Sequence, residues 1–127
     1  MAKFTYEQKT GNFFKQDSNG NSIFIERGYS GFEKGKNNPA METVHNVGPI
    51  PRGNWIIHSI IQRTPLHGPL VLPLEPAPGT ETFGRSGFLI HGDSIVEPGK
   101  ASQGCIILSR DTRIHIGSSG DSTLEVI

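Results

Sequence analysis

Residues 88–108 read FLIHGDSIVEPGKASQGCIIL, which is two apolar runs on either side of a polar loop. The first run ends at His91, and the second begins directly after Cys105, the only cysteine in the sequence. Short apolar runs bounded by glycine and polar residues are typical of buried β-strands. The stretch therefore predicts a strand over 86–91 that ends at the histidine, and a strand over 104–108 that carries the thiol into the core.

A cysteine and a histidine at the ends of neighbouring strands can form a catalytic pair. A thiol is a strong nucleophile only as a thiolate, and a nearby imidazole is a common means of removing its proton. Gly104 precedes Cys105, so the backbone can turn tightly and present N–H groups to a substrate oxygen. The alternative is that both residues are structural, because a lone cysteine often behaves as a small buried hydrophobe and such local signatures do not transfer between families.

The composition bounds the fold class. The 127 residues fit one domain, 1–127, which is long enough to bury a core. The formal net charge is zero, which argues against nucleic acid or an anionic membrane surface as a partner. One cysteine allows no internal disulfide. Sixteen glycines and nine prolines beside 34% hydrophobic residues predict turns and short strands, and hence a mainly β fold.

No segment of the sequence has the pattern of a membrane or export signal. Residues 1–9 contain no apolar segment of the kind that signal peptides carry. No apolar run approaches the length that a bilayer requires. We therefore expect a soluble protein without a signal peptide and without membrane insertion.

The N-terminal part of the chain has the pattern of a β-meander. Residues 3–7 alternate between polar and apolar, which predicts a strand with one buried face. Two further short runs, 13–14 and 22–26, flank Asn19 and Gly20. An Asn-Gly pair between such runs predicts a hairpin with a type I′ turn, because both central positions favour positive φ.

Two apolar runs in the middle of the chain predict further strands. Residues 55–61, WIIHSII, are almost continuously apolar, which favours a central strand buried on both faces. We expect His58, inside this run, to be structural. Residues 66–74 are interrupted by Pro69 and Pro73, and because proline donates no hydrogen bond to a sheet we place this run at an edge.

The remaining segments predict short helices and a closing strand. An Asn-Pro pair predicts a helical turn over 40–44. Ser109 has the character of an N-cap and predicts a short helix over 109–114, ended by the glycines of 117–120. Residues 122–127 then predict a last strand.

One glycine-rich segment is a candidate for ligand binding. Residues 27–46 are polar and irregular, and a long segment of this kind in a small domain is usually functional or disordered. Within it, Tyr29 and Ser30 could supply hydroxyl groups to a ligand. The alternative is a plain turn in which Tyr29 packs on the sheet.

The spacing around the cysteine resembles the active-site signature of the L,D-transpeptidases, the cysteine enzymes of peptidoglycan. The matching residues are His91, Gly92, Ser102, Gly104, Cys105, Ile106, Leu108 and Ser109. The sequence departs from that signature at two positions. It has Gln103 where many of these enzymes have histidine, and Ile107 where many have arginine or asparagine.

The whole chain resembles a narrower group, the small L,D-transpeptidase-like (YkuD-like) effectors that bacteria inject through the type VI secretion system. This resemblance rests on five blocks in order along the chain, at residues 28–31, 37–40, 48–53, 88–93 and 98–108. It implies a compact single-domain β-sandwich or barrel-like fold with one or two short helices, and neither a cofactor nor a metal.

The resemblance also implies an antibacterial function. The substrate would be the tetrapeptide stem of peptidoglycan. The enzyme would cleave the meso-diaminopimelate–D-Ala bond as an L,D-carboxypeptidase, or exchange the D-Ala for another D-amino acid as an L,D-transpeptidase. The implied partners are the type VI secretion machinery and a periplasmic immunity protein. The chain would be made in the cytoplasm, secreted, and active in the periplasm of the target cell.

In this hypothesis Cys105 attacks the substrate carbonyl, forms a thioester, and gives its proton to His91. Three groups could orient the His91 ring: Asp93, Ser102 and a backbone carbonyl. Backbone N–H groups near Gly104 and Cys105 could hold the oxyanion, and Gly92 is a further candidate for either role. Further candidates for substrate binding are Tyr29, Ser30, Gln103 and Arg110; for Arg110 the alternative is a solvated residue at a helix start.

Two other function classes stay open from the sequence. A zinc-dependent peptidoglycan hydrolase could use His67, His91, Asp93 and Cys105 as ligands, although no HExxH or paired-cysteine spacing supports it. A non-catalytic cell-wall-binding module would tolerate replacement of Cys105 and show no turnover.

Overall fold

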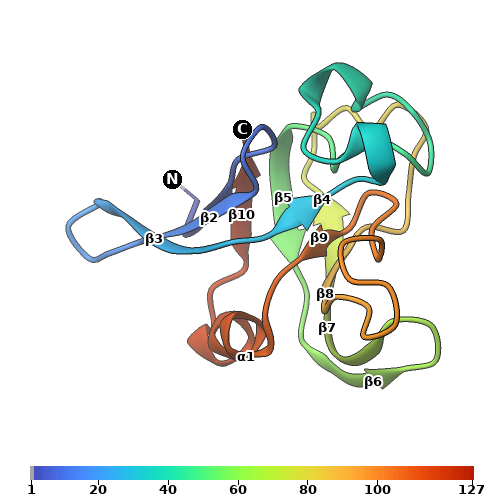
Figure 1. Cartoon of the computed structure of the whole chain (residues 1–127). Coiled ribbons are helices and arrows are strands. Elements are labelled where there is room, and N and C mark those ends of the chain that lie inside the picture. The colour runs from blue at the N-terminus through green and yellow to red at the C-terminus, as the bar shows by residue number, and fades with distance from the viewer. Residues whose placement is uncertain (1) are drawn as a thin grey trace.

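The computed structural model describes residues 2–127, and these residues form mainly β-strands with one α-helix and two short 3₁₀ helices (Figure 1). The strands are β1 Phe4–Tyr6, β2 Asn12–Gln16, β3 Ser22–Arg27, β4 Tyr29–Ser30, β5 Gly53–Ile57, β6 Ile61–Thr64, β7 Gly68–Pro76, β8 Leu89–His91, β9 Ile106–Ile107 and β10 Thr123–Val126. The helices are η1 Glu33–Gly35, η2 Pro39–Met41 and α1 Arg110–Ser119. The prediction of a mainly β fold with short helices is confirmed.

The strands of residues 2–127 join in one mixed sheet. The order is β3-β2-β1-β10-β5-β7-β8-β9-β4, and β6 pairs with β7 off this path. β10 lies between β1 and β5, so the C-terminal strand closes the middle of the sheet. β8 and β9 are parallel neighbours, whereas β9 and β4 are antiparallel. These last three strands carry the residues of the candidate site.

The N-terminal meander is confirmed, but its turn differs from the predicted type. β2 and β3 form the expected antiparallel hairpin around Asn19 and Gly20. Gly20 has φ +83°, whereas Asn19 is not among the residues with positive φ. The Asp17 carboxylate instead accepts hydrogen bonds from the Asn19 and Asn21 N–H groups, at 2.9 and 2.8 Å. These bonds hold a longer loop, so only one position needs the left-handed region.

The predicted strand over 55–61 is divided between two elements. β5 ends at Ile57, and β6 begins at Ile61. Trp55 and Ile57 are buried while Ile56 is only half-buried, so β5 lies centrally in the sheet but is not buried on both faces. His58 is exposed and its Nε2 lies 2.8 Å from Glu75, which fits the structural role expected for it.

The placement of residues 66–74 at an edge is wrong, because β7 is a central strand. Its residues 68–71 pair with β6, 72–73 with β8 and 74–76 with β5. Each neighbour pairs with only a short part of β7, so the missing proline N–H groups interrupt little of any one ladder. Pro73 still contributes its carbonyl, which accepts the His58 N–H at 2.9 Å.

The helix α1 begins where predicted and runs further. The Ser109 side chain accepts the Thr112 N–H at 3.4 Å, as expected of an N-cap. Gly117 does not end the helix; it lies in its last turns against Ile60, where a Cβ atom would come within 3.2 Å of the Ile60 side chain. Gly120, at φ +77°, forms the left-handed C-cap.

A single apolar core lies beneath the candidate site. Trp55 on β5 packs edge-on against Phe88, with ring centroids 5.0 Å apart. Ile90 and Ile106, which are paired across β8 and β9, are fully buried. Ile116 brings α1 into the same core. Packing against this core therefore fixes β8, which ends at His91, and β9, which begins directly after Cys105.

Candidate active site

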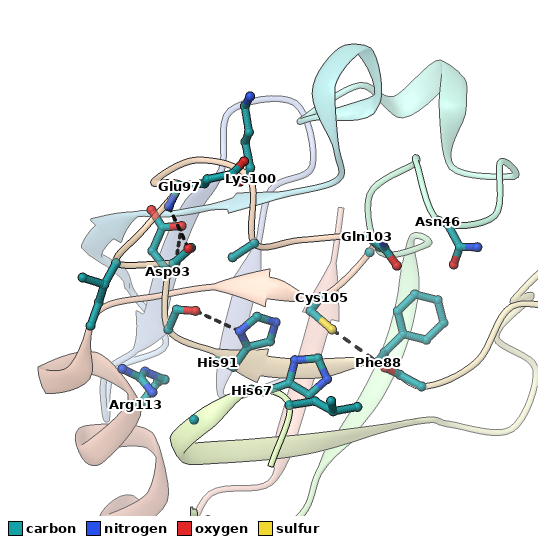
Figure 2. Close-up of a pocket in the computed structure, with 18 of the residues that line it drawn as sticks. Asn46, His67, Phe88, His91, Asp93, Glu97, Lys100, Gln103, Cys105 and Arg113 are labelled. Carbon is teal, nitrogen blue, oxygen red and sulfur yellow. Dashed lines mark hydrogen bonds between the residues drawn. The ribbon is translucent and has the colours of Figure 1, made fainter. Parts of the chain in front are cut away.

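The register of β8 and β9 turns Cys105 and His91 toward the same face of the sheet. Ile90 pairs with Ile106 and His91 with Ile107, so Cys105 stands one position before β9 and diagonally across from His91. Side chains two positions apart on neighbouring strands share a face. Both residues line a cavity of about 1100 Å³, and Figure 2 shows the thiol beside the imidazole there.

His91 is held as a neutral base, with one ring nitrogen bonded to the backbone and the other left without a partner. Its Nδ1 lies 2.9 Å from the Gly92 carbonyl oxygen, and because a carbonyl only accepts, Nδ1 carries the proton. Nε2 is therefore the basic atom. It is buried and has no hydrogen-bond partner among residues 2–127. A buried unpartnered acceptor at a cavity is the form expected of a general base awaiting substrate.

Of the three groups expected to orient the His91 ring, the backbone carbonyl, that of Gly92, is the one in contact with it. The Asp93 carboxylate is used elsewhere, since it accepts hydrogen bonds from Tyr29 and from the Ser94 N–H. The Ser102 hydroxyl contacts backbone groups around Cys105. Neither side chain reaches the His91 ring.

The resting thiol and imidazole are both neutral. Burial raises the pKa of Cys105 to about 11, although the Leu89 N–H and the Arg85 charge act against this rise. Burial also lowers the pKa of His91, and the charges of His67 and Arg113 lower it further, against the Gly92 carbonyl and Asp93. The pair is therefore not a preformed thiolate and imidazolium, and the thiol loses its proton as it attacks.

Ser102 fixes the turn that presents Cys105. Its buried hydroxyl accepts the N–H groups of Gly31, at 2.9 Å, and of Gly104, at 3.1 Å. It also donates to the Cys105 carbonyl at 2.6 Å. Because the Gly104 N–H is engaged in this way, it is not free to hold an oxyanion, contrary to the expectation from the sequence. The Cys105 N–H is the candidate donor that remains.

Ser30 supports the same turn from β4 and does not face a ligand. It is fully buried, its hydroxyl donates to the Gly104 carbonyl at 3.0 Å and accepts the Ile50 N–H at 2.9 Å. The expectation that Ser30 binds substrate is therefore wrong, because both sides of its hydroxyl are used within the protein. Its role is to join β4, the nucleophile turn and the segment before β5.

Tyr29 also acts within the protein. Its hydroxyl donates to the Asp93 carboxylate at 2.5 Å and accepts the Ala101 N–H at 3.0 Å. Burial and the Asp93 contact raise the pKa of Tyr29. Although burial opposes it, the hydrogen bonds from Tyr29 and the Gly99 N–H hold the pKa of Asp93 below its ordinary value. These contacts close the 92–103 loop from both ends.

Arg85 is a buried cation at the nucleophile turn that the sequence did not single out. It is 6% exposed, and its Cζ lies 5.2 Å from the centre of the Phe88 ring. It donates to four backbone carbonyls: Glu42 (2.5 Å), Pro49 (2.8 Å), Gly48 (2.9 Å) and Gln103 (3.4 Å). A Cβ atom at Gly104, whose φ is +137°, would come within 2.6 Å of Arg85, so only glycine fits there.

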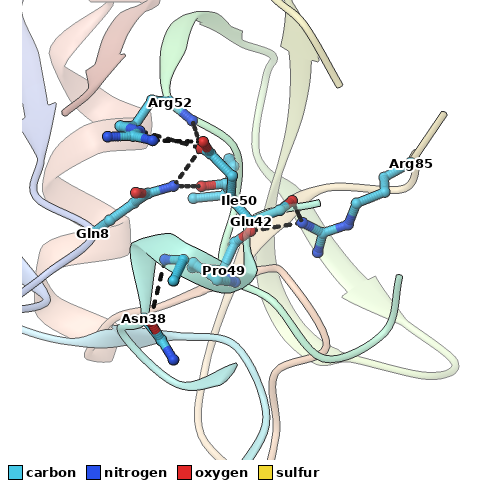
Figure 3. A network of polar contacts seen from close by, with 8 residues as sticks. Gln8, Asn38, Glu42, Pro49, Ile50, Arg52 and Arg85 are labelled. Carbon is cyan, nitrogen blue, oxygen red and sulfur yellow. Dashed lines mark hydrogen bonds and ion pairs between the residues drawn. The ribbon is translucent and has the colours of Figure 1, made fainter. Parts of the chain in front are cut away.

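The segment that Arg85 holds is fixed from its other side by a second polar network (Figure 3). The Glu42 carboxylate pairs with Arg52 at 2.6 Å and accepts from Gln8 at 3.0 Å. Gln8 is buried and also donates to the Ile50 carbonyl at 2.8 Å. One wall of the cavity is therefore tied to the turn between β1 and β2.

His67 stacks on His91 in the cavity. The two ring centroids are 4.6 Å apart and the ring planes are tilted by 39°. His67 belongs to the turn between β6 and β7, where its N–H donates to the Thr64 hydroxyl at 3.0 Å. From the sequence His67 was expected only as a possible zinc ligand, although its His-Gly dipeptide repeats that of His91.

The remaining sequence candidates lie at the rim. Gln103 and Arg110 are exposed and line the cavity. No group of three His, Cys, Asp or Glu side chains within residues 2–127 is arranged to hold a metal ion. Across the same range, no helix is both long and apolar enough for a membrane span.

Two solved structures share the fold of the whole chain at 14% sequence identity. Bd1075 of Bdellovibrio bacteriovorus matches with a TM-score of 0.58 over 99% of this chain and 48% of that one. A fused zinc-dependent amidase/peptidase/peptidoglycan-binding domain-containing protein of Clostridium acetobutylicum matches with a TM-score of 0.52 over 98% and 52%. This chain thus spans about half the length of each.

A family model gives the more specific relationship. No curated protein matches the chain. The model of the Tlde1 domain matches residues 25–120, which contain the candidate catalytic pair, the 92–103 loop and Arg85. The chain therefore belongs to the Tlde1 domain family, a family of type VI secretion effector domains.

Proposed function

We propose that this protein is an antibacterial cysteine enzyme that acts on the tetrapeptide stems of peptidoglycan. It cleaves the meso-diaminopimelate–D-Ala bond, or exchanges the D-Ala for another D-amino acid, or does both, through a thioester on Cys105. One observation carries the proposal: the buried His91 Nε2 has no partner among residues 2–127 and shares a cavity with the only thiol. Membership of an effector family supports the antibacterial part.

The acylation step follows from the protonation states of the pair. Cys105 Sγ attacks the carbonyl carbon of the third stem residue while its proton moves to His91 Nε2. The Cys105 N–H stabilises the oxyanion, by about 3 kcal/mol if well aligned. When the tetrahedral intermediate collapses, its C–N bond breaks, and His91 gives the proton to the departing amine. D-Ala leaves, and the acyl group stays on sulfur.

Deacylation reverses the roles with a new acceptor. His91 takes a proton from water or from the amine of a D-amino acid, which attacks the thioester. The C–S bond then breaks, and the thiol is restored when the proton returns from His91. Water gives a tripeptide stem, and an amine gives an exchanged tetrapeptide. Incubating the protein with muropeptides and analysing them by mass spectrometry identifies the broken bond and the acceptor together.

Neutral resting groups predict an unusual pH dependence. Cys105 should react with iodoacetamide at neutral pH at least about tenfold more slowly than an exposed cysteine, because thiolate is the reactive form. The labelling rate should rise as the pH approaches about 11, the raised pKa of Cys105. Turnover should persist below the ordinary histidine pKa of about 6.5, because the lowered pKa of His91 keeps its imidazole neutral there.

The measurement compares labelling and turnover over the same pH range. Fast labelling at neutral pH, with an inflection in the acidic range, would indicate a preformed thiolate–imidazolium pair. That result would contradict the neutral pair and the general-base step derived from it.

A second prediction separates this chemistry from zinc-dependent hydrolysis. Because the proposed steps use only Cys105, His91 and backbone groups, dialysis against a chelator should leave turnover unchanged. Metal analysis of the purified protein is the companion measurement. Loss of activity in chelator that added zinc restores would favour the zinc hydrolase.

A further inference from the structure

A second histidine, His67, covers one face of the proposed general base. Its ring centroid lies 4.6 Å from that of His91, and the ring planes are tilted by 39°, an arrangement in which flat rings attract each other. Figure 2 shows the two rings against each other in the cavity that they both line. Within residues 2–127 His67 forms its hydrogen bond through its main-chain N–H, not through its ring. The His67 ring is therefore engaged by its face, against His91.

The turn that carries His67 is fixed by contacts that do not involve His91. The Thr64 hydroxyl accepts the His67 N–H at 3.0 Å and donates to the Gly68 carbonyl at 3.1 Å. Gly68 pairs with Thr64 across the hairpin of β6 and β7, and its φ of +76° lies in the region that favours glycine. One side chain thus bonds both ends of the turn, and the turn sets where the His67 ring lies.

The start of β7, directly after this turn, is held by α1 in an unusual backbone conformation. Leu70 has φ +58°, a left-handed conformation that is uncommon for residues other than glycine. Arg113 of α1 donates from Nη1 to the carbonyls of Pro69, at 2.8 Å, and Leu70, at 2.9 Å, which flank the Leu70 Cα. Backbone strain persists only where the surroundings fix it, and it gathers at functional sites. The hairpin is therefore clamped to α1 with His67 in the cavity.

The His91 ring has a single hydrogen bond to orient it. The contact of Nδ1 with the Gly92 carbonyl, at 2.9 Å, limits rotation of the ring only loosely, because hydrogen bonds tolerate bending by some tens of degrees. Nε2 has no partner within residues 2–127. In the proposed reaction Nε2 must face Cys105 Sγ and then the departing nitrogen, and a small misplacement of a reacting group costs much of the rate. A contact against the ring face supplies the constraint that one hydrogen bond does not.

We infer that His67 is a positioning residue, whose ring holds the His91 imidazole in the plane in which Nε2 serves first Cys105 and then the leaving amine. The catalytic part of this inference rests on the proposed function, whereas the hold on the His91 ring does not. His67 exchanges no proton with the substrate and acts only through His91. A different flat ring should therefore replace it, and a side chain of similar length without a ring should not.

The kinetic test compares His67→Gln, which removes the ring, with His67→Phe, which keeps one, and with His58→Ala as an exposed histidine outside the cavity. His67→Gln should lower kcat for trimming of tetrapeptides by about 10- to 100-fold and leave KM within about twofold, because alignment is lost and binding is not. His67→Phe should keep kcat within about threefold of the native value, and His58→Ala should match the native protein. A change in KM alone, or an equal loss of kcat in His67→Gln and His67→Phe, would overturn the inference.

A measurement without substrate distinguishes failure of this inference from failure of the proposed function. NMR of protein with isotopically labelled histidine follows the Nδ1–H signal of His91, identified by its loss in His91→Ala, and its exchange with water. Exchange should be at least about tenfold faster in His67→Gln, because a freed ring breaks its bond to Gly92 more often. It should be unchanged in His67→Phe and in Leu66→Ala, an exposed neighbour in the same turn.

Faster exchange in His67→Gln supports the hold on His91 even if no turnover is found with any stem peptide. Equal exchange in the native protein and in His67→Gln overturns it, whatever the kinetics show. Thermal unfolding of each variant shows whether it is folded, and the comparison of His67→Gln with Leu66→Ala separates loss of the ring from a general loosening of the turn.

Discussion

Replacing Cys105 by alanine should lower kcat/KM for trimming of tetrapeptides by at least about 10⁴-fold, because no other thiol is present and the covalent route is lost. The fold should remain. The thiol makes only a long contact, 3.8 Å, to the Gly87 carbonyl, and the turn around it is held by Ser102 and Ser30. We expect a loss of about 1 kcal/mol in the free energy of unfolding. Muropeptide kinetics and thermal unfolding measure the two effects.

The histidines supply matched variants for the same experiment. His91→Ala should cost almost as much as Cys105→Ala, and the double variant should be no worse, because the two act as a unit. His58→Ala is the control, since His58 is exposed and its partner is Glu75. Undiminished trimming by Cys105→Ala protein would contradict the thioester mechanism, whereas intact cell-wall binding without any native turnover would favour the binding module.

Local patterns in the sequence are sufficient to predict the strands whose partners are close in the chain. The N-terminal hairpin and the helix cap at Ser109 depend on contacts within a few residues. The position of β7 in the sheet, in contrast, depends on strands that are distant in the sequence. Its prolines exclude a regular central ladder, and nothing local shows that three different neighbours would each pair with only part of the strand. The predicted type I′ turn at Asn19 was wrong for a similar reason. The Asp17 side chain accepts backbone hydrogen bonds that hold a different turn geometry.

Some residues of the candidate site could likewise be predicted from the sequence, and others could not. The Cys105 and His91 pair could be proposed because each stands at the edge of an apolar run and the spacing resembles a known signature. Arg85 could not, because it is recognised only by the backbone carbonyls that it binds, and carbonyls leave no mark in a sequence. The sequence also suggested that Ser30 binds substrate, whereas its hydroxyl bonds to the backbone of the nucleophile turn. A serine that binds a ligand and a serine that stabilises a turn look the same in a sequence.

The 127-residue chain should be harmless to Gram-negative cells when it is kept in the cytoplasm and lethal when an added export signal delivers it to the periplasm. The proposed tetrapeptide stems lie outside the inner membrane, and only there can Cys105 reach them. Trimmed stems have lost the bond from meso-diaminopimelate to D-Ala and cannot act as donors for cross-links that break this bond, so growing cells should round up and lyse. Viable counts and microscopy after induction measure the effect.

The Cys105→Ala chain with the same export signal separates chemistry from mere delivery. It retains the fold, the cavity and any affinity for the cell wall, so it should leave viability unchanged. A periplasmic inhibitor that covers the cavity should protect cells from the intact form in the same assay. Equal toxicity of the intact chain with and without the export signal would place the target in the cytoplasm and overturn the peptidoglycan proposal. Toxicity that survives the loss of Cys105 would locate the damage in binding, not in catalysis.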